Sequence, residues 1–379
     1  MVVTVRSTGN RRARLVQALA ALAGSVVFSL LLAEIVLFRL LLPGADQPVV
    51  QFSAEAVVKH LPNQRGTYRI KNEIAAPFRI NQDGWNSGHE RYVREKGQQP
   101  RIAVIGDSYV EALQVSYDAS LAERIEGFCG GQCEAYRFGI SGAPLSQYWH
   151  VLRREAASFD PDWAVVIVVQ NDFDESFTYR ERQQQSAFLK LRMEGNRVMG
   201  EIEPSPPVAP WHEPLKALGI YRSLWIRYQL RAALVAPVGL NDPTGGADLS
   251  GQLEAMRAAA RYVVDRMRDF SAQHGIRLLF VMDGDRMPIY DGEAGAAPDQ
   301  SKGWGTLRAM MREVTREAAV DLLDLHEVFA ADYRLNRRAF NFANDYHWNE
   351  HGHELAAQAI YRHIADVKKS PVDAPPGPH

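Results

Sequence analysis

The chain has 379 residues, of which 46% are hydrophobic, enough for one large domain or two modest ones. Its 43 Lys and Arg residues nearly balance 45 Asp and Glu residues, which argues against the basic face that nucleic-acid binding usually requires. The two cysteines are too few to form a structural zinc site by themselves.

The N-terminal residues contain the pattern of a membrane segment. Four arginines come first: Arg6, Arg11, Arg12 and Arg14. The apolar stretch over 15–42 is longer than the ~30 Å hydrocarbon core at about 1.5 Å per residue, so a span of about 20 residues fits within it. The arginines before the span, with no comparable cluster directly after it, predict a cytoplasmic N-terminus. We expect a basic cytoplasmic tail over 1–14 and a single transmembrane anchor over 15–42.

A cleaved signal peptide is the alternative interpretation of this segment. Signal peptides usually have an apolar core of about 7–15 residues, followed by a cleavage site with small residues. The stretch here is longer and continues into Leu-rich sequence, which favours an uncleaved anchor in the inner membrane. Both interpretations place the rest of the chain in the periplasm or outside the cell.

Residues 43–100 show no sustained helical period. Within them, 78–81 alternates as a strand does, and Gln82-Asp83-Gly84 supplies turn chemistry. We expect a juxtamembrane extension that packs on the main domain, and the sequence does not indicate its function.

The main domain is predicted over 101–367. Short apolar runs predict strands at 102–105, 134–138, 163–169, 277–282 and 321–325. Helical patterns alternate with them at 121–128, 145–158, 252–274, 305–318 and 350–365. Strands separated by helices favour an α/β fold with a doubly wound, flavodoxin-like parallel sheet flanked by helices.

The pattern loosens over about 174–250. Five prolines crowd 204–214, and 218–235 has the pattern of an amphipathic helix with aromatic residues. Because this insertion is too long for an ordinary connection, we expect either a cap over the site or a surface that docks on the membrane or a partner. The last residues, 368–379, include four prolines and are expected to be a disordered tail.

Polar residues follow three of the predicted strands. Gly106-Asp107-Ser108 ends the first strand, Gly142 follows the second, and Asn171 follows the third. In open α/β sheets, ligands bind at this carboxyl edge. Ser108 would open a helix there, where negative charge is stabilised, and it is either an ordinary N-cap or a nucleophile.

A late polar loop carries Asp345 and His347. Acyl transfer by a serine needs a base, a carboxylate that orients the base, and donors for the developing oxyanion. In an extended loop, residues i and i+2 point to the same side, so Asp345 and His347 could face Ser108 together. Candidate oxyanion donors are the backbone N–H groups of Ser108 and Gly142 and the side-chain amide of Asn171.

These motifs together resemble the SGNH, or GDSL-type, hydrolases. The resemblance covers residues 101 to about 365 and rests on four blocks in the family's order: Gly106-Asp107-Ser108, Ser141-Gly142, Gln170-Asn171-Asp172 and Asp345-Tyr346-His347. Two departures concern Gln170, where glycine is usual, and the Asp-x-His spacing, which is shorter than the commoner Asp-x-x-His. Membrane-linked and polysaccharide-modifying branches of the family share that shorter spacing.

The resemblance implies a serine esterase, with Ser108 as nucleophile, His347 as base and Asp345 as the residue that orients the base. Ser108, Gly142 and Asn171 would form the oxyanion hole. We expect a membrane-anchored enzyme that acts on an acyl ester, with O-acetyl as the first candidate, of a cell-envelope or exported polysaccharide. It would work beside the machinery that handles that polysaccharide. No cofactor or metal is implied, because triad chemistry needs none.

Three alternatives stay open. An O-acetyltransferase would use the same acyl-enzyme and pass the acyl group to a sugar hydroxyl instead of water. A lipid esterase or thioesterase is favoured only by the membrane anchor. A non-catalytic glycan-binding scaffold would have kept the fold, and the presence of all five candidate groups argues against it.

Two further predictions concern the cysteines and the other histidines near His347. Cys129 and Cys133 lie four residues apart in an exported chain, which favours a disulfide over a free buried pair. His351 and His353 fall in the predicted closing helix about 200° apart, so they cannot share a face. We therefore expect His347 alone to act as the base.

Overall fold

The computed structural model describes residues 9–36, 46–70, 73–178, 186–206, 251–291 and 303–369. The chain divides into two compact units, one with residues 1–45 and 209–238 and the other with 46–208 and 239–379. The predicted helix over 218–235 and the predicted disordered tail, apart from its first two residues, lie outside the described residues.

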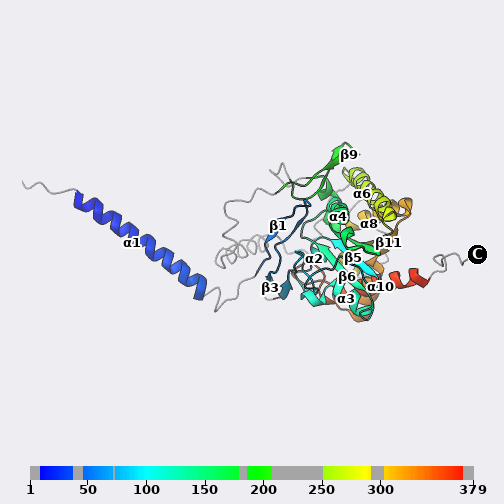
Figure 1. The fold of residues 1–379 in the computed structure, drawn as a ribbon, viewed down its shortest axis with the longest axis horizontal. Helices are drawn as coiled ribbons and strands as arrows, with labels where there is room; N and C mark the ends of the chain where they lie inside the picture. Colours follow the sequence, from blue (N-terminus) through cyan, green and yellow to red (C-terminus); the bar gives the residue numbers. More distant parts are fainter. Residues whose placement is uncertain are drawn as a thin grey trace, which may run out of the picture. The chain divides into compact units, whose positions relative to one another are not determined.

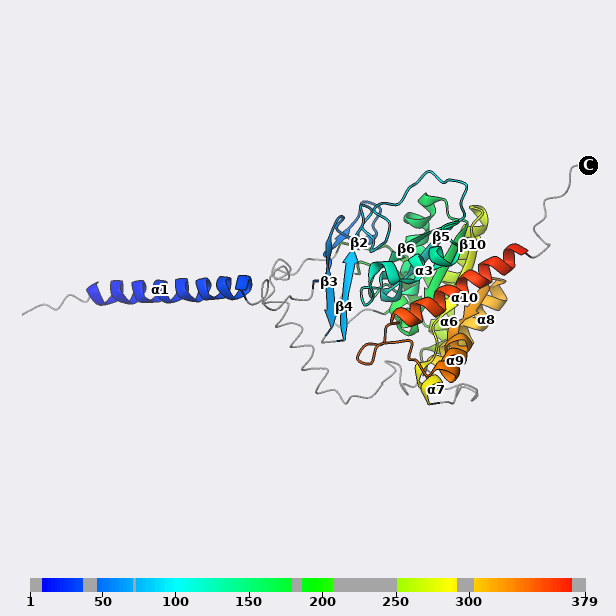
Figure 2. The same ribbon diagram turned by 90° about the horizontal axis from the view of Figure 1, so that it is seen from below.

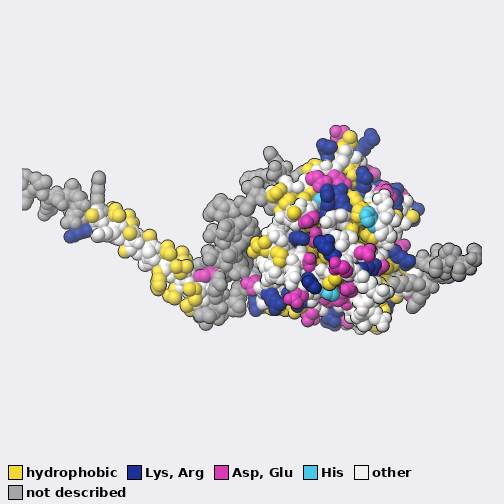
Figure 3. All heavy atoms as spheres, in the orientation of Figure 1, with side chains coloured by type: hydrophobic (Ala, Val, Ile, Leu, Met, Phe, Trp, Pro, Cys, Tyr) yellow, Lys and Arg dark blue, Asp and Glu magenta, His cyan; other side chains and the backbone are white. Residues whose placement is uncertain are grey.

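The described part of the first unit, residues 9–36, forms the long helix α1, Gly9–Ala33 (Figure 1). The segment Ala13–Val36 is long and apolar enough to cross a membrane, by length and composition. Its apolar side chains, such as Leu22 and Phe28, are exposed in the monomer, and Figure 3 shows them along the helix. A signal sequence has the same properties, so the helix is a candidate span, and its orientation stays a prediction.

The second unit is built on a five-stranded parallel sheet in the order β11-β10-β7-β5-β6. The bounds are β5 Arg101–Gly106, β6 Glu134–Gly139, β7 Trp163–Val168, β10 Arg277–Met282 and β11 Asp321–Asp324. All residues of β5 and β7 are buried, as expected for central strands that are covered on both faces. The predicted doubly wound α/β architecture is confirmed.

Helices cover both faces of this sheet (Figure 2). One face packs on α4, α6 and α8, and the other on α3, α9 and α10. Alternate residues of β5 point to opposite cores, with Ile105 in the first and Val104 in the second. The helix bounds are α3 Leu121–Phe128, α4 Leu145–Arg154, α6 Leu253–Gln273, α8 Gly303–Ala318, α9 Leu325–Asn336 and α10 Glu350–Lys369.

Short elements complete the unit. Two short helices are α2 Ser108–Glu111 and α7 Arg286–Tyr290. The 3-10 turns are η2 Tyr117–Ala119, η3 Ala156–Phe159, η4 Gln170–Asp172 and η5 Asp174–Ser176. Three antiparallel pairs join β1 Val50–Phe52 with β2 Val58–His60, β3 Arg65–Ile70 with β4 Ile74–Arg79, and β8 Lys190–Glu194 with β9 Arg197–Ile202.

Two differences between the structure and the predicted elements concern helices that flank the sheet. The predicted helix over 145–158 ends at Arg154, and the chain continues through η3. Helix α9 was not predicted, although Asp324 caps it by accepting a hydrogen bond from the N–H of His326. Glu327 stands three residues after this cap, and that spacing is a typical start signal for a helix.

The extension packs on the main domain through buried aromatic residues. The Trp85 ring is buried and contacts Phe138 edge to face at a centroid distance of 5.4 Å. Tyr92 stacks on Tyr136 at 4.2 Å, and its hydroxyl donates to the Arg137 carbonyl oxygen at 2.9 Å. The extension is therefore part of the folded unit rather than a free linker.

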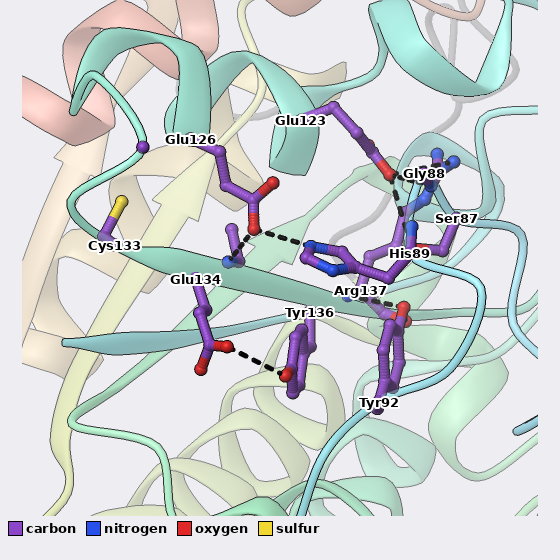
Figure 4. A network of polar contacts seen from close by, with 12 residues as sticks. Ser87, Gly88, His89, Tyr92, Glu123, Glu126, Cys133, Glu134, Tyr136 and Arg137 are labelled. Carbon is purple, nitrogen blue, oxygen red and sulfur yellow. Dashed lines mark hydrogen bonds and ion pairs between the residues drawn. The ribbon is translucent and has the colours of Figure 1, made fainter. Parts of the chain in front are cut away.

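A polar network holds the end of this extension against α3 and the beginning of β6 (Figure 4). The Nε2 atom of His89 lies 2.7 Å from Oε1 of Glu126, and the same oxygen accepts from the N–H of Ala135 at 2.6 Å. Nearby, a disulfide joins Cys129 to Cys133 and so links the end of α3 to β6. These contacts lie at the amino end of β6.

His89 should make folding depend on pH. Burial opposes its protonation, but the hydrogen bond and charge of Glu126 outweigh burial and raise the pKa of His89 above its ordinary 6.5. This contribution to stability is therefore complete below the unfolded-state pKa and is lost as pH rises through the folded-state pKa. We predict that His89→Gln lowers the free energy of unfolding by about 0.5–1 kcal/mol at acidic pH and by less at alkaline pH.

Denaturant titrations at about pH 5.5 and about pH 9 would measure this difference in the second unit. Lys96→Gln, which removes a partly exposed ion pair with Asp162, is the control, because that pair contains no histidine. An equal loss of stability for His89→Gln at both pH values would contradict the prediction.

Candidate active site

Ser108 stands at the carboxyl edge of the sheet, where β5 turns into α2. The cap of α2 is Asp107, whose carboxylate accepts a hydrogen bond from the N–H of Tyr109 at 3.0 Å. Ser108 is therefore the first helical residue and not the N-cap. This arrangement leaves its hydroxyl available for other contacts.

The structure brings Ser108, His347 and Asp345 together. The Nε2 atom of His347 lies 2.7 Å from Oγ of Ser108, and its Nδ1 lies 2.5 Å from Oδ1 of Asp345. An ionised carboxylate can only accept a hydrogen bond, so Nδ1 of His347 carries the hydrogen and donates a hydrogen bond to Asp345. Nε2 then has a free lone pair that accepts from the Ser108 hydroxyl. The predicted proximity is therefore present, and the catalytic roles of the three residues remain predictions.

Asp345 is suited to hold His347 in this tautomer. Burial opposes the charge of its carboxylate, but the hydrogen bond and charge of His347 outweigh burial and lower the pKa of Asp345. The same oxygen also accepts from the backbone N–H of His347 at 2.9 Å. The carboxylate thus stays ionised and fixes the imidazole through two donors from one residue.

A second carboxylate, that of Asp107, lies on the other side of the Ser108 hydroxyl. Oγ of Ser108 is 3.3 Å from Oδ2 of Asp107, longer than its 2.7 Å contact with His347. Burial raises the pKa of Asp107 to about 6, while hydrogen bonds and the charge of His347 oppose that rise. Because the hydroxyl has one proton, the shorter contact favours donation to His347.

The loop that carries His347 is fixed through its two neighbours in the chain. The Tyr346 carbonyl oxygen accepts from the Arg286 guanidinium at 2.6 Å and from the Tyr109 hydroxyl at 3.0 Å. The indole N–H of Trp348 donates to the buried Asp283 at 2.8 Å, and Arg286 also pairs with Asp283 at 2.7 Å. Both neighbours are thus tied to the residues that follow β10.

The candidate oxyanion donors flank Ser108 on the adjacent strands. Gly142 follows β6 on one side and has φ +76°, a conformation that favours glycine. Asn171 lies in η4 after β7 on the other side, and its side-chain amide is 3.4 Å from a carboxylate oxygen of Glu175. The second N–H of that amide leaves it able to donate elsewhere, so its oxyanion role stays a prediction.

Asp172 holds the turn that presents Asn171. Its buried carboxylate accepts from the N–H of Val169 and from the hydroxyl of Tyr148, both at 2.7 Å. Gln170, which replaces the usual glycine, lines a small cavity of about 30 Å³ together with Arg286 and Tyr346. Gln170, which departs from the family pattern, therefore lies beside Arg286, the residue that holds the His347 loop through the Tyr346 carbonyl oxygen.

The other two histidines make different contacts. His351 pairs with Asp332 at 2.7 Å. His353 is buried, and burial, with the positive charge of Arg137, lowers its pKa to about 3, so it is neutral. Within the described part of the chain, no group of three or more His, Cys, Asp or Glu side chains is placed to hold a metal ion.

Three residues that support the triad were not among the predicted site residues: Tyr109, Asp283 and Arg286. Two of them had a usable signal. Asp283 and Arg286 directly follow the predicted strand over 277–282, at the edge where Ser108 was expected. A polar run in that position was reason enough to include them among the candidates.

Comparison with known proteins gives one family match. The model of the "SGNH hydrolase-like domain, acetyltransferase AlgX" family matches residues 247–376, a range that includes Asp345 and His347 but not Ser108. The match agrees with the predicted resemblance, and its range includes one of the four sequence blocks, Asp345-Tyr346-His347. No curated protein sequence matches the chain.

Several solved structures are similar at low identity. An acetyl xylan esterase, AlAXEase, is 14% identical over 70% of this chain and 99% of that chain, with a TM-score of 0.39. A lipase/acylhydrolase from Enterococcus faecalis is 12% identical over 71% of this chain and 97% of that chain, also with a TM-score of 0.39. A two-domain esterase active on acetylated mannans is 12% identical over 74% of this chain and 53% of that chain, again with a TM-score of 0.39.

The hydrogen bond between His347 and Ser108 predicts which histidine activates the serine. We expect His347→Ala to slow labelling of Ser108 by a fluorophosphonate by roughly 10³-fold or more, because no base then takes the proton. Peptide mass spectrometry would locate the label and measure its rate.

His351→Ala and His353→Ala are the controls, and both should label at nearly the native rate. Because His353 is buried, its variant is expected to unfold at a lower temperature. Circular dichroism would verify the fold of each variant. Labelling at the native rate in folded His347→Ala protein would show that the assigned base is wrong.

Proposed function

We propose that this chain, which carries an SGNH hydrolase-like domain, is a serine esterase that acts on an acyl ester of a cell-envelope or exported polysaccharide. The O-acetyl group is the proposed acyl group. The observation that carries the proposal is the hydrogen-bonded series Ser108–His347–Asp345, with its contacts of 2.7 Å and 2.5 Å at the carboxyl edge of the sheet. The domain type supports an esterase or an acyltransferase.

In the first step, Oγ of Ser108 attacks the acyl carbonyl carbon while Nε2 of His347 takes the hydroxyl proton. Asp345 stabilises the imidazolium that forms. The carbonyl oxygen becomes an oxyanion, which the N–H groups of Ser108 and Gly142 and the amide of Asn171 would stabilise. His347 then gives its proton to the sugar oxygen as the carbon–oxygen bond breaks, which leaves acyl-Ser108 and a free sugar hydroxyl.

The second step regenerates the enzyme. A water molecule attacks the acyl carbon, and His347 takes one of its protons. When the new tetrahedral intermediate collapses, His347 returns that proton to Oγ of Ser108. The products are a carboxylic acid and the free serine, so no external reductant, oxidant or cofactor enters the balance.

An O-acetyltransferase is the second candidate function. It is favoured by the matched family description, which names an acetyltransferase. It shares the acyl-Ser108 intermediate and differs only in the second step, where a sugar hydroxyl replaces water. An assay that offers both water and a sugar hydroxyl therefore distinguishes the two functions.

Export is part of the same proposal. If Ala13–Val36 spans the inner membrane with its arginines in the cytoplasm, the catalytic unit is periplasmic and faces exported polysaccharide. A reporter that is active only outside the cytoplasm should then work when it is fused after Pro43.

The proposed activity can be measured on the full chain in detergent with p-nitrophenyl acetate, with and without an acetylated oligosaccharide or a sugar acceptor. We expect release of p-nitrophenol and acetate that Ser108→Ala abolishes. Transfer of acetyl to the sugar at the expense of free acetate would favour the transferase. Turnover that persists in Ser108→Ala protein would contradict the proposal.

Asn171 should affect the rate rather than the fold. Because its amide would stabilise the oxyanion formed in the transition state, Asn171→Ala is expected to lower kcat by roughly 10²–10³, or about 3–4 kcal/mol, with little change in KM. Asn336→Ala, at the exposed end of α9, is the matched control. If folded Asn171→Ala protein keeps the native kcat, Asn171 does not stabilise the oxyanion and its role is structural.

A further inference from the structure

We propose that residues 46–70 and 73–92 of the extension form a positioning element of the active site and act through two carboxylates, Glu111 and Glu73. The proposal rests on the function proposed above. It assigns a role to a segment whose sequence indicates none, and it concerns the loops that carry Gly142 and Asp345 rather than the reacting atoms themselves.

The first carboxylate joins three separate parts of the chain. Glu111 ends α2, the helix that Ser108 begins, and its Oε1 lies 2.6 Å from Nε2 of His60 on β2 of the extension. Its other oxygen accepts from the backbone N–H of Ser141 at 3.0 Å and from the Ser141 hydroxyl. The extension thus reaches the residue next to Gly142 through a single side chain.

The side chains of Glu111 and His60 are buried, so their polar atoms depend on partners within the protein. The Glu111 side chain is 3% exposed and that of His60 is 2% exposed. Burial opposes the charge of the carboxylate, but the hydrogen bond and charge of His60, with the donors of Ser141, outweigh burial and lower the pKa of Glu111. An ionised buried carboxylate is costly without its donors, so Ser141 and His60 are held where they can supply them.

Backbone packing supports the same positions. A Cβ atom on Gly139, at the end of β6, would lie 2.2 Å from the backbone nitrogen of Glu111, so α2 and β6 approach as closely as glycine allows. From the extension, the Asn86 side-chain amide donates to the Glu111 carbonyl oxygen at 2.8 Å. Both ends of the residue, backbone and carboxylate, therefore contact the extension.

The second carboxylate holds the loop of the triad. Glu73, just before β4, accepts from the N–H of Ala343 at 2.5 Å and from the N–H of Asn344 at 2.9 Å. The side-chain amide of Asn344 also donates to it, at 3.0 Å. These donors immediately precede Asp345, so Glu73 fixes the backbone from which the triad carboxylate projects.

Tyr68 lies on β3, which pairs with β4 in this hairpin. Burial raises its pKa above the ordinary value, and the negative charges of Asp345 and Glu111 act in the same direction. Figure 2 shows the β3–β4 hairpin beside the loop that leads into α10.

A second histidine of the extension, His89, also binds the main domain but does not contact the active site. It therefore provides a control. His89 pairs with Glu126 at 2.7 Å, as His60 pairs with Glu111, but at the amino end of β6 (Figure 4). If the extension only stabilises the fold, losing either pair should have similar consequences. If it positions the site, only the contacts of Glu111 and Glu73 should affect catalysis.

The test compares His60→Gln, Glu73→Gln and His89→Gln, which change residues of the extension, with Glu111→Gln beside them, all in the full chain in detergent. With p-nitrophenyl acetate we expect kcat to fall by several-fold for His60→Gln and Glu73→Gln and by about 10- to 100-fold for Glu111→Gln, with KM nearly unchanged. His89→Gln should keep native kcat. Thermal unfolding by circular dichroism verifies each fold, and Glu73→Gln, an exposed contact, serves if Glu111→Gln does not fold.

Hydrogen exchange measured by mass spectrometry gives a readout that needs no activity. Exchange should become faster over 139–143 in His60→Gln and Glu111→Gln and over 341–349 in Glu73→Gln, and over neither peptide in His89→Gln. If the native protein lacks turnover that depends on Ser108, the proposed function fails, and exchange alone decides whether the extension holds the two loops. Native exchange over 139–143 in His60→Gln and over 341–349 in Glu73→Gln, with native kcat in both of these variants, would overturn the inference.

Discussion

The site depends on the parallel register of three neighbouring strands. Gly106 at the end of β5 pairs with Gly139 at the end of β6, and Ile105 pairs with Val166 of β7. Parallel strands in register end at the same edge, so the turns after them open side by side. Ser108, Gly142 and Asn171 therefore all follow strand ends at this one edge.

Buried carboxylates hold the turns at this edge in place. Asp107, Glu111, Asp172 and Asp283 are almost completely buried, and each accepts from donors in neighbouring turns. A buried carboxylate without donors is unfavourable by several kcal/mol, roughly, so each one constrains the backbone that surrounds it. The same burial raises the pKa of Asp107 and Asp172, whereas donors lower that of Glu111. The difference follows from the number of strong donors and from nearby charges.

The sequence could predict those parts of the site that depend on local pattern. Apolar runs ending at Gly106 and Val169 identify strands, and the residues that follow them lie at one edge whatever the details of packing. The two-residue spacing of Asp345 and His347 similarly predicts a shared face. Supporting contacts were not predictable in this way. Arg286 binds the Tyr346 carbonyl across 60 positions, and no local period encodes such a pair.

The contacts of the extension are even less predictable from local sequence pattern. His60 contacts Glu111 across 51 positions, and Glu73 contacts Ala343 across 270. Both side chains look like ordinary surface residues in the sequence, because their partners are set by tertiary packing. The predicted strand near 78–81 was the only clear element there, and β4 in fact covers Ile74–Arg79.

In the proposed reaction, Ser108 carries the acyl group during turnover. Rapid acid quenching of the full chain during reaction with an acetyl ester, followed by peptide mass spectrometry, would trap this intermediate. We expect an acetyl group on Ser108 and a larger acetylated fraction when deacylation is slowed. Continued turnover with no acetylated Ser108, or with acetyl on another residue only, would contradict the proposed reaction.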